Sequence, residues 1–146
     1  MASVKGANIT LLDATPATMI DAASNSGNLQ VWHDTYEASS LASGSDITIG
    51  RTPAGATIHD VIVKCDALGS GVTLKVGDSG DDDRYLAVVG TWNAAGQCQS
   101  MLAGSTAANT AVAGLAYKVS DATDIKITTG GAAATGTIFF WVHYSM

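Results

Sequence analysis

The chain has 146 residues and a net charge of −6, and only 14% of its residues are charged, compared with about 25% in an average protein. Its seven lysines and arginines form no cluster, which argues against a groove that binds nucleic-acid phosphates. No apolar run reaches the length of a signal-peptide core or a membrane span, so we predict neither a signal peptide nor contact with a membrane.

Residues 1–26 differ from the rest of the chain. Their apolar residues include one short run with Ile9, Leu11 and Leu12, and small residues follow it. A helical turn over residues 17–23 would be too short to be stable alone. We therefore predict an extended N-terminal arm that packs on a neighbour or on its own domain, with an ordinary disordered terminus as the alternative.

Residues 27–146 are predicted to form one all-β domain. Short segments alternate apolar and polar residues, as strands with one buried face do. Turn residues recur roughly every 8–12 positions, which indicates a β-sandwich, with a jelly roll as the leading connectivity. The expected strands cover residues 28–38, 46–50, 57–65, 72–76, 85–89, 97–103, 115–119, 124–128 and 137–144.

The segments 57–65 and 72–76 carry the clearest alternation. The first divides its apolar residues between two faces, with Val61, Val63 and Cys65 on one and Ile58 and Ile62 on the other. The connector 66–71 has glycines where a tight loop needs positive φ. We expect the two segments to pair as a hairpin.

The last segment, residues 137–144, is apolar on both faces. Phe139, Trp141 and His143 point one way, while Ile138, Phe140, Val142 and Tyr144 point the other. Such a strand either lies in the middle of a sandwich or leaves one face for a partner. Phe139 and Trp141 are therefore candidates for the core or for an oligomer contact.

Motifs that would carry reaction chemistry are missing from the sequence. It contains no nucleophile elbow, zinc-protease motif or phosphate-binding loop, and its three histidines are far apart in the chain. The acidic run 78–83 could bind Ca²⁺, but its spacing does not fit an EF-hand, and a solvated turn is the alternative. We predict no enzyme activity, no cofactor and no metal.

The cysteines and tryptophans leave alternatives open. Cys65 is expected to be a buried free thiol, although a disulfide with Cys98 is possible in principle. Trp32, Trp92 and Trp141 could form a platform for a sugar ring, and Trp92 in its loop is the best candidate. A loop tryptophan is also a common interface anchor.

Two long segments resemble small virion proteins of tailed bacteriophages. They are TIHDVIVKCDALGSGVTLKVGDSGDDDRY, residues 57–85, and GLAYKVSDATDIKITTGGAAATGTIFFWVHY, residues 114–144. In particular, their strand-and-turn pattern resembles capsid decoration (cement) proteins. The likeness covers about two thirds of the chain and does not include the arm.

This resemblance implies a homo-oligomer, commonly a trimer, on the outside of the capsid, where it clamps capsomer junctions by binding the major capsid protein. It implies a virion protein made in the cytoplasm of a bacterial host. The shortage of charge agrees, since interface cores are depleted in charge, although a neutral polar surface would give the same composition. The expected contact residues are Ile9, Leu11, Leu12, Trp92, Phe139 and Trp141. The alternative is a head-fibre or tail-associated module that binds host glycans through Trp92.

Overall fold

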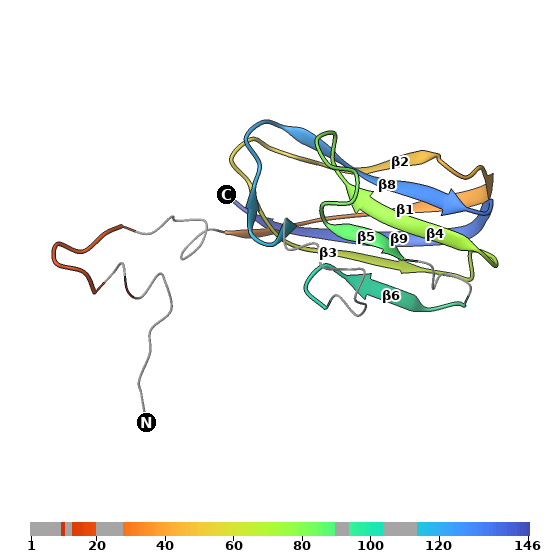
Figure 1. Ribbon diagram of the computed structural model, residues 1–146, viewed down its shortest axis with the longest axis horizontal. Coiled ribbons are helices and arrows are strands. Elements are labelled where there is room, and N and C mark those ends of the chain that lie inside the picture. The colour runs from red at the N-terminus through yellow and green to blue at the C-terminus, as the bar shows by residue number, and fades with distance from the viewer. Residues whose placement is uncertain (1–9, 11–12, 20–27, 90–93, 104–113) are drawn as a thin grey trace, which may run out of the picture.

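The computed structural model describes residues 10, 13–19, 28–89, 94–103 and 114–146, and its strands form two antiparallel sheets packed face to face (Figure 1). The prediction of an all-β sandwich is confirmed. The strands are β1 (Leu29–Leu41), β2 (Asp46–Thr52), β3 (Thr57–Cys65), β4 (Val72–Gly77), β5 (Leu86–Val89), β6 (Gln97–Ser100), β7 (Tyr117–Lys118), β8 (Thr123–Gly131) and β9 (Ala134–Ser145).

Sheet A has the order β1-β9-β3-β6, with the short β7 also paired to β3, and sheet B has the order β2-β8-β4-β5. The predicted hairpin of β3 and β4 is wrong, because these strands lie in different sheets. Each carries an apolar face that must meet another apolar layer, so the connector crosses from one sheet to the other. Gly69 and Gly71 in this connector do have positive φ, at 116° and 80°.

Alternating positions on both sheets fill the core as the sequence pattern predicted. Burying one aliphatic or aromatic side chain stabilises a fold by about 1.5–3 kcal/mol, so this layer dominates the stability of the sandwich. The buried side chains include Ile47, Ile49, Val61, Val63, Val72, Leu74, Val76, Ile125, Ile127, Ile138, Phe140 and Val142.

Strand β3 departs from simple alternation. The register with β9 shifts between Ile58 and Asp60, as in a β-bulge. An extra residue in one strand turns the following side chains to the other face. Ile58, predicted to lie opposite Val61, is therefore buried together with it.

Phe139 and Trp141 lie on the face of β9 that points away from the core. Both are half-buried, whereas their neighbours Ile138, Phe140 and Val142 are at most 1% exposed. The suggestion that Phe139 and Trp141 belong to the core is wrong, because the inner face of β9 is already occupied by the intervening residues.

The described part of the N-terminal segment, residues 13–19, is exposed and lies apart from the sandwich (Figure 1). Ile9, Leu11 and Leu12 lie outside the described residues, and the division into an arm and a domain stays a prediction. Within the described residues, no helix is long and apolar enough to cross a membrane.

Candidate functional site

The outward side of sheet A carries a continuous row of apolar and aromatic side chains. Strand pairing places His33 of β1, Trp141 of β9 and Ile62 of β3 next to one another across the sheet. The ring centroids of His33 and Trp141 are 6.5 Å apart. We call this surface the outer face of sheet A. Its apolar, aromatic and basic part comprises Val31, His33, Ile62, Lys64, Cys98, Phe139, Trp141 and His143, and the polar residues Thr35, Glu37, Ser100 and Thr137 lie on the same side.

Few charges interrupt the outer face. Phe139, Trp141 and Ile62 are half-buried, and Val31 is 55% exposed. Asp60 borders the face, but the residue is only 8% exposed. Its carboxylate accepts hydrogen bonds from the Ser100 hydroxyl at 2.8 Å and from the Leu102 amide at 3.2 Å. Asp60 is thus satisfied inside the chain, and the face can be desolvated without stranding this carboxylate.

The two cysteines lie on opposite sides of sheet A. Cys65 pairs with Ile138 and is buried in the core, whereas Cys98 pairs with Lys64 and is exposed at the margin of the outer face. Both are free thiols, so the alternative of a disulfide is not realised. Burial, aided by the negative charge of Asp66, raises the pKa of the Cys65 thiol to about 11.

The acidic turn after β4 is built around Asp78. This carboxylate is nearly buried and accepts hydrogen bonds from the amides of Gly80 and Asp81 at 2.9 and 3.1 Å. It also binds the Arg84 guanidinium at 2.8 Å and the Tyr85 hydroxyl at 3.0 Å. Four donor groups around one carboxylate hold the turn closed from within.

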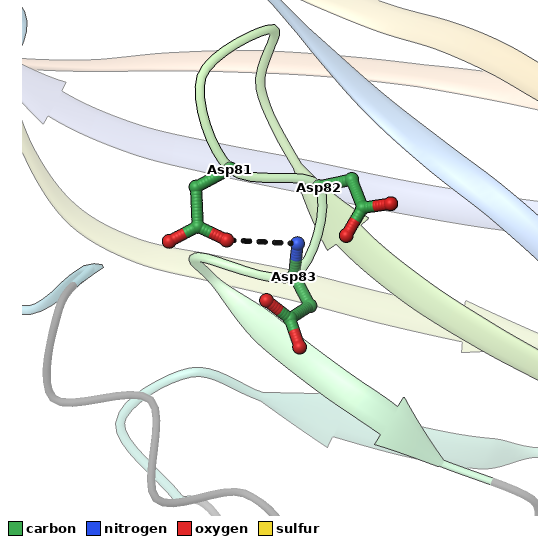
Figure 2. Close-up of side chains that lie close together, drawn as sticks. All are labelled: Asp81, Asp82 and Asp83. Atoms are coloured by element: carbon green, nitrogen blue, oxygen red, sulfur yellow. Dashed lines mark hydrogen bonds between the residues drawn. The ribbon is translucent and has the colours of Figure 1, made fainter.

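Three carboxylates of the same turn, Asp81, Asp82 and Asp83, come within 4.8 Å of one another (Figure 2). The Asp83 amide donates to the Asp81 carboxylate at 3.4 Å, and Lys75 pairs with Asp82. Hydrogen bonding to Asp81 and partial burial raise the pKa of Asp83. One hydrogen bond and one ion pair thus tie Asp81 and Asp82 to the chain, and the choice between a solvated turn and a Ca²⁺ site stays a prediction.

One hydroxyl–imidazole pair has the composition of a nucleophile and its base. The His59 Nε2 atom lies 2.7 Å from the Ser145 hydroxyl. Ser145 is only 2% exposed, so its oxygen is not open to a substrate. We interpret the pair as a structural hydrogen bond between β3 and β9.

A cleft of about 580 Å³ opens where β1 and β2 form the neighbouring edges of the two sheets. Trp32 and Asp34 line it from β1, and Thr48, Gly50 and Arg51 line it from β2. Across β2 and β8, Arg51 forms a two-pronged ion pair with Asp124, at 2.6 and 3.2 Å. The hydrogen bond from Arg51 lowers the pKa of the Asp124 carboxyl.

The structure brings together only part of the predicted contact set. Phe139 and Trp141 lie side by side on the outer face, but Trp92, Ile9, Leu11 and Leu12 are outside the described residues. Sequence reasoning noted Trp32 only as a possible sugar platform and did not single out Ile62 or Val31. The sequence did contain a signal for Ile62 and Val31. When apolar residues occupy both the inward and the outward positions of one strand, that strand has a second apolar face.

Comparisons with known proteins find similarity in structure alone. No protein-family model matches, and no curated protein is similar in sequence. A chain in the capsid asymmetric unit of cyanophage Pam1 has a TM-score of 0.66 and 23% identity over 92% of this chain and 96% of that one.

Two further chains share the fold. One comes from the capsid of Ralstonia phage GP4, with a TM-score of 0.59 and 20% identity over 88% of both chains. The other comes from an acidic stable capsid structure of Helicobacter pylori bacteriophage KHP30, with a TM-score of 0.59, 10% identity and coverage of 81% of this chain and 87% of that one. At these identities the likeness establishes a common fold.

Proposed function

We propose that this chain is a non-enzymatic structural protein of a tailed-phage virion. In this role it binds the outside of the assembled capsid and stabilises the junctions between capsomers. The observation that carries the proposal is that the same sandwich occurs in chains from three phage capsids and spans most of each chain. The neighbours are therefore small single-sandwich chains like this one.

The outer face of sheet A supplies a surface suited to such binding. Trp141 and Phe139 lie in the middle of the sheet with Ile62 beside them, and Lys64 is the basic residue of this face. Interface cores are rich in aromatic residues and poor in charge, and tryptophan is prominent among residues that dominate binding energy. We assign the contact with the capsid, or with a second copy of the chain, to this face.

We include the jelly-roll connectivity in the proposal. Strands β1 to β4 alternate between the sheets, and the last strand, β9, is inserted between β1 and β3. The orders β1-β9-β3-β6 and β2-β8-β4-β5 support a jelly roll, in which two Greek keys wrap around one core. The proposed homo-oligomer, a trimer, would be measured by sedimentation velocity of the purified protein.

Stabilisation would follow from binding linkage. A protein that binds only the assembled shell shifts the equilibrium towards that shell by RT ln(1 + [L]/Kd), which is about 2.7 kcal/mol per site at one hundred times Kd. Many sites on one capsid add up, so a modest affinity at each junction resists a large internal pressure.

Co-sedimentation with shells of the cognate major capsid protein tests the proposal. We expect saturable binding at a stoichiometry that matches a capsid symmetry axis. Absence of binding to mature shells would contradict the proposal and would favour a module that binds host glycans. A glycan array with the isolated protein would then test that alternative.

Cys98 offers a footprint of the docking face without any substitution. Alkylation of Cys98 should be slowed on shells, because this thiol lies at the margin of the outer face. Cys65 is the internal reference, since burial keeps its thiol protonated and inaccessible in both states. Binding without protection of Cys98 would place the contact elsewhere on the molecule.

A further inference from the structure

The edge of the sandwich formed by β1 and β2 differs from the rest of the surface. Both strands are the last members of their sheets, so each has a neighbour on one side only among the described strands. The cleft of about 580 Å³ lies between them. This volume is within the range of about 300–1,000 Å³ typical of binding pockets.

Trp32 forms one wall of the cleft and is held there by β2. A Cβ atom added to Gly50 would lie 3.1 Å from the Cδ1 atom of the Trp32 ring, so the indole rests directly on the glycine backbone. Trp32 is nevertheless 42% exposed. A large ring that is fixed in place and still open to solvent can bury further area without losing much side-chain entropy.

The backbone of β1 is also available at this edge. The Thr35 amide donates to its neighbour, the Asp34 carboxylate, at 2.8 Å, which indicates that it points away from β9. Residues two apart in a strand present their amides to the same side. The amides of Val31 and His33 therefore face the open edge as well.

The first half of β1 has few of the features that protect an edge strand. Natural edges are protected by lysines, prolines, bulges or very short strands. β1 is 13 residues long, its sequence LQVWHDTYEASSL has neither Lys nor Pro, and its register shift comes only after Ala38. Leu29 and Val31 are 63% and 55% exposed.

We propose that this edge binds a segment from the N-terminal arm of a second copy of the chain, with residues 9–12 added in extended form beside Leu29–His33 and apolar side chains in the cleft. Thr10 is helical in the single chain, so this binding requires the segment to unwind. This inference goes beyond the proposed function, because arm exchange between copies requires no capsid. In β-strand addition the backbone supplies hydrogen bonds and the pockets select alternate side chains. Ile9 and Leu11 are two residues apart and would point to the same side.

The length of the arm fits exchange between copies. Residues 13–28 separate the apolar run from β1, and a fully extended chain of this length would span about 50 Å. Residues 13–16 form a turn and bends in the single chain, so this span is the longest reach of the arm. β1 itself spans about 43 Å at strand geometry. The arm can therefore reach from the start of its own β1 to the edge of a neighbour, and its described residues 13–19 lie away from their own sandwich (Figure 1).

Cross-linking between two populations of the full-length protein tests the proposal. One carries Leu11→Cys and the other Thr48→Cys, both with Cys98→Ser, and they are mixed at high concentration and oxidised. We expect a disulfide-linked dimer of one copy of each. The matched control replaces Thr48→Cys by Ser70→Cys, which is exposed in the β3–β4 connector outside the cleft lining, and should give at least tenfold less product.

A proline scan of the edge provides the second readout. Val31→Pro removes an amide that faces the open edge and leaves the pairing with β9 intact, so the fold should persist. We expect about tenfold slower cross-linking for Val31→Pro and an unchanged rate for Val31→Ala.

Two results would overturn the proposal. One is equal cross-linking to Thr48→Cys and Ser70→Cys, and the other is a disulfide that forms only within single chains carrying both Leu11→Cys and Thr48→Cys. Capsid binding is measured separately, so failure of one proposal leaves the other standing.

Discussion

Both faces of sheet A carry apolar side chains, but within the described part of the chain only the inner face is covered by the other sheet. On β9 the inner residues Ile138, Phe140 and Val142 are at most 1% exposed, while the outer residues Phe139 and Trp141 stay half-buried. The same strand thus contributes to folding through one set of side chains and leaves the other set unused. Apolar content alone therefore does not distinguish a core from a binding surface.

The largest effect is expected from the inner face. Phe140→Ala should lower the free energy of unfolding by about 3–5 kcal/mol, because it removes a fully buried ring and leaves a cavity. Denaturant unfolding measures the change. A loss below about 1 kcal/mol would show that the inner face is not the main source of stability.

A buried carboxylate, Asp78, is also expected to contribute more to stability than an exposed one. Asp78→Ala should cost about 3 kcal/mol, because Arg84 and Tyr85 lose their partner in a largely buried place. Asp83→Ala in the same turn is the control and should cost much less, since that side chain is exposed. Equal losses for the two variants in thermal or denaturant unfolding would contradict the role of Asp78.

Alkaline pH probes the inner face through Cys65. The pKa of the Cys65 thiol is raised to about 11 in the folded chain. Above the pKa of the unfolded chain, the unfolded state loses this proton while the folded state keeps it. The free energy of unfolding therefore falls as pH rises through this range. Between pH 8 and 10 the loss is about 1.4 kcal/mol.

Cys65→Ala should flatten this part of the stability profile, although the variant is less stable at neutral pH. Tyr85, whose pKa is raised by burial and by Asp78, affects the profile at still higher pH. An unchanged slope in Cys65→Ala would exclude the thiol as the cause.

The smallest effect on stability is expected from the outer face. Trp141→Ala should change the free energy of unfolding by less than about 1 kcal/mol, because its ring is not part of the core. The same variant should lose capsid binding at least tenfold in co-sedimentation. A large loss of stability would mean that Trp141 supports the sheet, and the contrast between the faces would fail.

Much of the fold could be predicted from local pattern. Alternation identified the inward sides of β2, β4 and β8, and glycines marked the turn at Gly69 and Gly71. Pairing could not be predicted in the same way, because β3 and β4 are adjacent in sequence but belong to different sheets. The bulge near Asp60 could not be predicted either. One extra residue turns the following side chains to the other face of the strand without changing the composition.

The candidate site shows the same division. The sequence marked Phe139 and Trp141, and it left open whether they were core or contact. It did not group them with His33 and Ile62, which lie far away in the chain and meet only because β1 and β3 flank β9. The cleft around Trp32 likewise exists only where the edges of two sheets come together.

The amino-acid sequence was enough to predict that the chain is all-β and that its last strand has two apolar faces. These properties depend on residues close in the chain, through period-two alternation and turn chemistry. The tertiary structure alone decided which apolar face is buried and which is open, because burial depends on the order of strands within two sheets. That order is set by long-range packing, which no local pattern encodes.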